Sequence, residues 1–167
     1  MSDKKKLLRR ARFWLLLFII GLALSGLSAI LIEPVVKFLE GIAGDGSRIG
    51  AASPELASWL TDVYHGVRNA GREYPFLFYG TDWLAFAHLA IAVIFMAPLR
   101  RPARNLPVIH AGMIACFLVI PWALFFGPIR DVPFFWQLID CSFGVAGLIA
   151  LLLARRCTRK LIAIEGR

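Results

Sequence analysis

Four apolar runs, each long enough to cross a lipid bilayer, dominate this 167-residue chain. A membrane-spanning α-helix needs about 20 consecutive apolar residues, and 59% of the residues here are hydrophobic. Because backbone polar groups in hydrocarbon must pair within their own segment, such runs form helices. We therefore predict an all-α membrane protein with one integral membrane domain over residues 1–167. Its four transmembrane helices cover about 13–33, 76–98, 106–127 and 133–154, with an outer helical loop at 35–75.

Basic residues alternate along the chain between dense and sparse segments. All of the 19 Lys and Arg lie before the first run, between the second and third, or after the fourth, except for Lys37, Arg48, Arg68, Arg72 and Arg130. Lys and Arg collect on the cytoplasmic side, so this pattern predicts cytoplasmic N- and C-termini, in a bacterial inner (plasma) membrane. It also explains the net charge of +8 without nucleic acid, and it makes membrane lipids the expected partner.

The two ends of the chain resemble targeting or tag segments. The first apolar run is too long for a signal peptide, and Glu33-Pro34 follows it in place of a cleavage site, so we expect a retained anchor. The last four residues, Ile164 to Arg167, spell a protease recognition sequence common in expression tags and receive no functional weight. The three cysteines form no disulfide framework and are expected to pack within the protein.

The segment between the first two runs predicts helices outside the membrane. A helical pattern continues after Pro34, so the first helix is expected to kink there. Residues 44–53 are rich in Gly and Ser and predict a loop. Ser53-Pro54-Glu55 then starts an amphipathic helix on the outer (periplasmic) side. In the first run, small residues at spacings of four and three predict a close helix contact at Gly21, Ser25 and Ser28.

Asp82 and Asp140 each lie inside an apolar run. Counted at about 1.5 Å per residue, Asp82 stands about 24 Å above Pro98, and Asp140 about 21 Å above Ala154. An ionisable group at such a depth is costly and marks a pathway, a ligand site or a helix contact. Asp82 has a structural alternative, which is to cap the start of its helix together with Thr81. The alternative for Asp140 is a carboxylate bonded to a neighbouring helix.

Further polar and aromatic residues gather toward the same outer side. His88 near mid-membrane is either a satisfied interior histidine or a proton relay below the two carboxylates. The outer aromatic residues form interfacial belts or wall a cavity. Together these observations predict an outward-facing ligand-binding set, which comprises Asp82, Asp140, His88, Gln137, Trp136, Tyr79, Trp83 and Glu33.

No signature in the sequence names a reaction or a cofactor. A haem held by His88 and His110 is disfavoured because their heights differ by about 7 Å, so no cofactor and no metal are predicted. Walker, HExxH, GxSxG and CxxC motifs are absent from the sequence. Four spans with two membrane carboxylates are superficially similar to lipoprotein signal peptidases, but the Asn, Gly and Asp-Arg motifs of that family are missing, so no activity is implied.

Three classes of function therefore stay open. The first is binding or translocation of a small or lipid-like ligand in a polar pocket within the helix bundle, and we take it as the working prediction. The second is a small membrane enzyme that uses paired carboxylates on a lipid-embedded substrate. The third is a non-catalytic subunit of a larger membrane complex or a homo-oligomer, in which the polar residues join helices.

Overall fold

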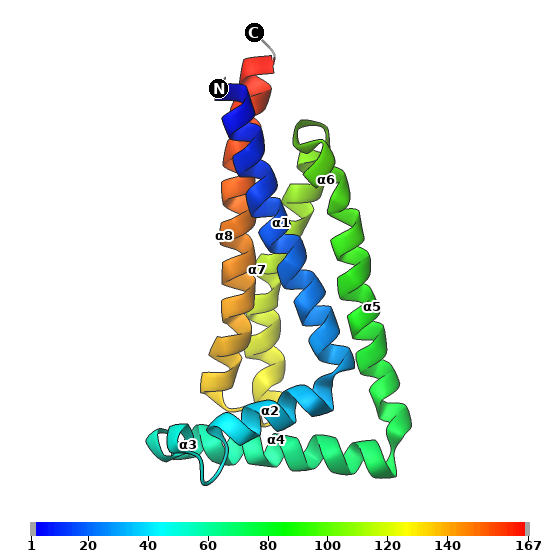
Figure 1. Ribbon diagram of the computed structural model, residues 1–167, viewed down its shortest axis with the longest axis vertical. Coiled ribbons are helices and arrows are strands. Elements are labelled where there is room, and N and C mark those ends of the chain that lie inside the picture. Colours follow the sequence, from blue (N-terminus) through cyan, green and yellow to red (C-terminus); the bar gives the residue numbers. More distant parts are fainter. Residues whose placement is uncertain (1–2, 166–167) are drawn as a thin grey trace. The chain divides into compact units, whose positions relative to one another are not determined.

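Every regular element in the computed structural model is a helix within residues 3–165, which are the residues that the structure describes (Figure 1). The all-α prediction is confirmed for this range. Gly166 and Arg167, part of the expected tag remnant, lie outside it. The chain divides into two compact units. We call residues 1–22 with 90–167 the terminal unit and residues 23–89 the middle unit; a single membrane domain stays a prediction.

Four of the helical segments are long and apolar enough to cross a membrane. They cover Asp3–Ile30, Pro75–Arg100, Pro102–Ile129 and Phe134–Ile164. Only 11% to 33% of the most apolar window of each is buried within the chain, so most of that surface requires lipid or another protein around it. The four predicted spans are confirmed as candidate spans, and the finding indicates an integral membrane protein.

The first long helix ends earlier than the sequence pattern predicts. Helix α1 (Asp3–Ile30) stops at Leu31, whose backbone leaves the helical region at φ −95° and ψ 34°. Helix α2 (Ile32–Ala43) then begins, with Pro34 in its first turn. A proline there has no helical hydrogen bond to lose, so the break falls before Pro34 and not at it. Glu33 therefore belongs to α2 and not to the first span.

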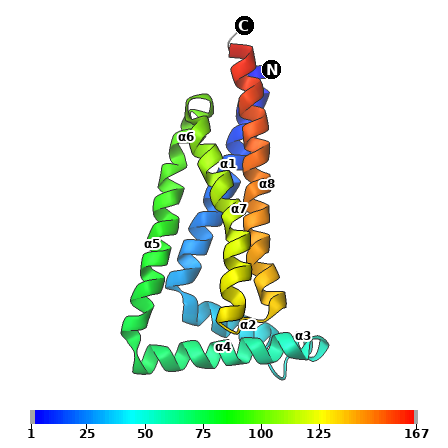
Figure 2. The ribbon, with the colours of Figure 1, turned by 180° about the vertical axis from the view of Figure 1, so that it is seen from behind.

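In the middle unit, α2 packs beside α4 (Pro54–Glu73), with the short α3 (Arg48–Ala52) between them in sequence (Figures 1 and 2). Helix α3 corrects the predicted loop at 44–53, and the Ser47 side chain caps it by accepting a hydrogen bond from the Gly50 N–H at 2.8 Å. Ser53 precedes α4 but makes no side-chain cap.

Helix α4 is amphipathic, as predicted. Its buried residues are Ala57 and Leu60. Its exposed residues include a polar stripe at spacings of three and four, which comprises Glu55, Ser58, Asp62, His65, Asn69 and Glu73. Such a stripe is the solvated face of a surface helix.

A close helix contact forms in the middle unit, but not at the predicted residues. A Cβ built on the buried Gly26 of α1 would lie 3.1 Å from the Ala85 carbonyl oxygen of α5 (Tyr79–Ile94). Gly21, Ser25 and Ser28 are exposed within the described chain. The small-residue prediction therefore identified the right helix and the wrong face.

The second long segment is continuous in hydropathy but not in helix type. The 3-10 helix η1 (Pro75–Phe78) leads into α5, and Phe95 separates α5 from α6 (Met96–Arg100). Pro98 lacks the N–H that would bond to the Ile94 carbonyl, which explains why the helix is interrupted at this point. A second 3-10 helix, η2 (Pro102–Asn105), then leads into α7.

Helices α7 (Leu106–Ile129) and α8 (Phe134–Glu165) form the packed core of the terminal unit (Figure 2). A Cβ on Gly144 of α8 would lie 2.7 Å from the Cys116 carbonyl oxygen of α7, so the two backbones approach closely. Toward the other end of the pair, the Arg155 Nε–H donates to His110 Nε2 at 2.9 Å. The buried apolar cluster of the terminal unit comprises Leu15, Phe95, Ile109, Cys116, Leu151 and Ala154.

Candidate functional site

A groove between α7 and α8 in the terminal unit is the strongest candidate site. Its volume is about 590 Å³. All but two of its side chains are apolar, and the two exceptions are Asp140 and Arg130. The lining residues are Ala115, Leu118, Val119, Trp122, Ala123, Phe126, Gly127, Arg130, Val132 and Asp140. An apolar groove with two opposite charges suits an amphipathic ligand.

Asp140 contributes a carboxylate without a partner. It is the seventh residue of α8, half-buried, and two turns into the helix, beyond the first-turn positions where an acid favours the helix dipole. Among the described residues it makes no hydrogen bond or ion pair. The structural alternative, a carboxylate bonded to a neighbouring helix, therefore finds no partner within residues 3–165. What the side chain does face is the groove.

Arg130 stands at the end of the groove where α7 stops. Its backbone N–H donates to the carbonyls of Phe126 and Gly127, both at 3.1 Å, which closes the last turn. A cation at this position is favoured by the negative end of the α7 dipole. Its exposed side chain makes no ion pair with Asp140 or with any other described residue. The two charges therefore stand apart in one groove, each available to a ligand.

The turn that presents these two residues is built by Gln137 and Gly127. The buried Gln137 donates its Nε2–H to the Val132 carbonyl at 2.7 Å, and its side chain fills the space where a Cβ on Gly127 would stand. Asp131, in the same turn, has a positive φ of 53°. Such a conformation is more accessible to Asp and Asn than to most residues, and it lets the chain reverse within four residues.

Two other predicted site residues of the terminal unit do not line the groove. Gln137 points into the α7–α8 turn, and Trp136 is half-buried beside it in sequence. Gln137 therefore has a structural role within the described chain. Its proposed contact with a ligand stays a prediction, as does that of Trp136.

The remaining predicted residues belong to the middle unit. Asp82 is exposed in the first turn of α5, and the neighbouring Thr81 hydroxyl donates to the Phe78 carbonyl at 2.7 Å. This position matches the structural alternative, in which the acid favours the helix dipole. Glu33 is exposed in the first turn of α2. Because Asp82 and Asp140 fall in different units, their meeting in one pocket stays a prediction.

His88 and the two outer aromatic residues have local partners along α5. His88 Nδ1 lies 2.8 Å from the Leu84 carbonyl oxygen, which gives the ring a hydrogen bond within its own helix. This contact favours the satisfied histidine over the proton relay. The Tyr79 and Trp83 rings, both largely exposed, meet edge-on with centroids 6.0 Å apart. Exposed Tyr and Trp side chains of this kind are typical of a membrane interface.

Sequence reasoning missed most of the groove wall, although a signal was present. Trp122, Phe126 and Arg130 follow each other at spacings of four, which places them along one face of a helix. This face could not be distinguished in the sequence because α7 is apolar on all sides, so no polar face indicates which side packs inward.

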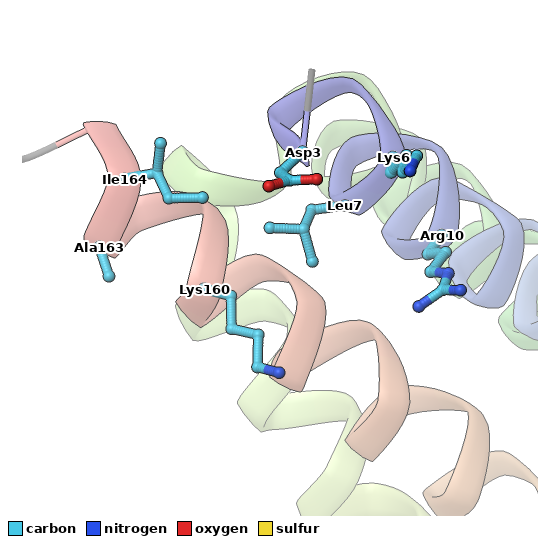
Figure 3. Close-up of a pocket in the computed structure, with 7 residues that line it drawn as sticks. All are labelled: Asp3, Lys6, Leu7, Arg10, Lys160, Ala163 and Ile164. Carbon is cyan, nitrogen blue, oxygen red and sulfur yellow. The ribbon is translucent and has the colours of Figure 1, made fainter. Parts of the chain in front are cut away.

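Two basic hollows lie elsewhere in the terminal unit. The first, shown in Figure 3, lies between the start of α1 and the end of α8 and is lined by Asp3, Lys6, Leu7, Arg10, Lys160, Ala163 and Ile164. The second lies between α1 and α6 and is lined by Arg9, Arg12, Phe13, Leu16, Leu99 and Arg100. The first hollow brings the beginning and the end of the described chain together.

Within residues 3–165, no group of three or more His, Cys, Asp or Glu side chains is placed to hold a metal ion. Comparisons with protein families, with characterised proteins and with solved structures find no match to this chain.

Proposed function

We propose that this protein binds an amphipathic, lipid-like ligand in the α7–α8 groove. The observation that carries the proposal is the Asp140 carboxylate, which is half-buried, without a partner among the described residues, and set in an otherwise apolar wall. Holding an ionisable group in a candidate span costs stability, and such groups usually serve a ligand. Trp122 and Phe126 in the same wall offer apolar surface to a hydrocarbon chain.

The two charges suggest the chemistry of the polar end of the ligand. An ionised carboxylate only accepts hydrogen bonds, so Asp140 takes an ammonium or a hydroxyl group. The Arg130 guanidinium takes a phosphate or a carboxylate, often through two parallel hydrogen bonds. A zwitterionic headgroup that carries both an ammonium and a phosphate satisfies both residues. Phosphatidylethanolamine has this chemistry and serves as the probe.

The proposed binding is tested by lipid-dependent thermal stability of the purified protein in a neutral detergent. We expect dioleoylphosphatidylethanolamine to raise Tm of the wild type by on the order of 5 °C near saturation. Asp140→Asn keeps the fold but loses most of this shift, because a neutral amide attracts an ammonium weakly. An equal shift in wild type and Asp140→Asn contradicts the proposal.

Asp131→Asn is the matched control. It removes one negative charge from the connection between α7 and α8, close to the groove, but Asp131 does not line the groove. Asn also tolerates the positive φ of that residue. We expect it to retain the lipid-dependent shift of the wild type. If both Asn variants lose the shift equally, the lipid responds to general charge and not to Asp140.

We further propose that both termini are cytoplasmic and that the groove opens in the outer half of the membrane. The basic segments in the first turns of α1, around η2 and at the end of α8 support this orientation through the positive-inside rule. Fusing a reporter that is active only in the cytoplasm to either terminus should give signal, whereas a fusion within residues 44–47 should not. Signal from the internal fusion alone reverses the orientation. The enzymatic and subunit alternatives stay predictions.

A further inference from the structure

One face of α1 changes from basic to apolar within two turns. Arg9, Arg12, Phe13 and Leu16 follow at i, i+3, i+4 and i+7, so they share one stripe of the helix. Phe13 and Leu16 are 57% and 46% exposed although they lie in a candidate span. With Leu99 and Arg100 of α6, this stripe lines a hollow of about 470 Å³.

The cationic end of this hollow is partly fixed in place. The Arg12 Nε–H donates to the Leu99 carbonyl at 3.2 Å, and an Nη2–H donates to the Arg100 carbonyl at 3.1 Å. These carbonyls belong to the last turn of α6, which has no helical donors left for them. Arg12 thereby ties α1 to α6 and keeps a positive charge in the hollow that Arg9 and Arg100 also line. Among the described residues, the side chains of Arg9 and Arg100 make no ion pair or hydrogen bond.

We propose that the α1–α6 hollow binds the headgroup of one anionic phospholipid. The phosphodiester lies between the Arg9 and Arg100 guanidinium groups, which match phosphate oxygens in geometry and charge. An acyl chain then runs along Phe13 and Leu16 toward the membrane interior. Basic pockets between helices at the cytoplasmic ends of spans are recognised binding places for such headgroups. The site is separate from the α7–α8 groove and does not depend on the function proposed for it.

The order of residues along α1 favours a lipid over a free phosphate. An inorganic phosphate gains nothing from the exposed Phe13 and Leu16, whereas a lipid needs an apolar surface just below its headgroup. None of the described side chains that line the hollow is acidic, so no carboxylate there competes for the arginines. The hollow of Figure 3 differs on this point, because the acidic Asp3 lines it together with Lys6, Arg10 and Lys160.

The two hollows provide a matched experiment. Arg9→Gln with Arg100→Gln removes two charges from the proposed site, and Lys6→Gln with Lys160→Gln removes two charges from the other hollow of the same unit. Arg12 stays unchanged because it joins α1 to α6. Each purified protein is titrated with dioleoylphosphatidylglycerol in a neutral detergent, where no charged lipid surface is present, and binding is followed by native mass spectrometry and by Tm. Circular dichroism checks that both double variants keep the helical content of the wild type.

We expect the Arg9/Arg100 variant to bind the anionic lipid about 20- to 30-fold more weakly, at about fivefold for each arginine. The Lys6/Lys160 variant should stay within about threefold of the wild type, since neither lysine lines the α1–α6 hollow. Equal losses in the two variants overturn the proposal in favour of diffuse charge. Equal binding of dioleoylphosphatidylcholine also overturns it, because the site then does not discriminate by the net charge of the lipid. Equal stabilisation by inorganic phosphate overturns it as well, because the acyl chain then contributes nothing to binding.

Discussion

Helices α5 and α8 each have one carboxylate within their first three turns, Asp82 and Asp140 respectively. Counted along the sequence, the two lie at similar predicted depths in the membrane. In α5, Asp82 is exposed in the first turn, and a Cβ built on the neighbouring Gly80 meets no described atom within 4 Å beyond its chain neighbours and its own helix backbone. In α8, Asp140 is half-buried two turns in, and Gly144 packs against the backbone of α7. The place of a carboxylate relative to the helix start, more than its depth, therefore decides whether it stabilises the helix dipole, and Asp140 lies beyond the turn where it could.

The largest expected difference between α5 and α8 is in how much a glycine-to-alanine substitution changes the free energy of unfolding. Gly144→Ala places a methyl group 2.7 Å from the Cys116 carbonyl oxygen, a backbone atom that moves only if α7 moves. We expect this variant to lower the free energy of unfolding in detergent by about 2–3 kcal/mol. Gly80→Ala meets no neighbour in the described chain and should be neutral or stabilising by up to about 1 kcal/mol, because alanine favours the helix. Equal effects contradict the close α7–α8 contact.

Neutralising the two carboxylates should change stability in opposite directions. Asp140→Asn removes a half-buried charge without a described partner, so the ligand-free protein gains about 1–2 kcal/mol. Asp82→Asn removes a favourable contact with the α5 dipole and should cost a few tenths of a kcal/mol. Both are measured by denaturant unfolding without added lipid. A loss of stability in Asp140→Asn implies a partner for that carboxylate and contradicts our view of the groove.

The sequence was sufficient for the four candidate spans and for the amphipathic α4. Span length follows from bilayer thickness, and an amphipathic stripe follows from helix periodicity, so both are local properties of the chain. The break at Leu31 and the helix α3 were missed because they depend on small backbone choices near Pro34 and Ser47 that composition does not resolve.

The candidate site was predicted only in part. Asp140 was identified because a charge in an apolar run stands out. In the sequence Arg130 is only one charge in a sparsely basic segment, and no pattern indicates that Gln137 closes a turn. Both gaps have one cause, since which face of an apolar helix turns inward is set by packing against its neighbour. A pattern of hydropathy carries no such information when every face is apolar.

The smallest contrast concerns the hydrogen bonds that begin the two helices, and it separates structural residues from ligand-binding ones. Gln137→Met keeps the side-chain volume but leaves the Val132 carbonyl without its donor, so we expect a loss of about 1 kcal/mol. Thr81→Val removes the local bond to the Phe78 carbonyl, three residues away, and should cost no more than about 1 kcal/mol. Neither variant should change the Tm shift produced by phosphatidylethanolamine, whereas Arg130→Gln should reduce it. A reduced shift in Gln137→Met would instead support the predicted contact of Gln137 with the ligand.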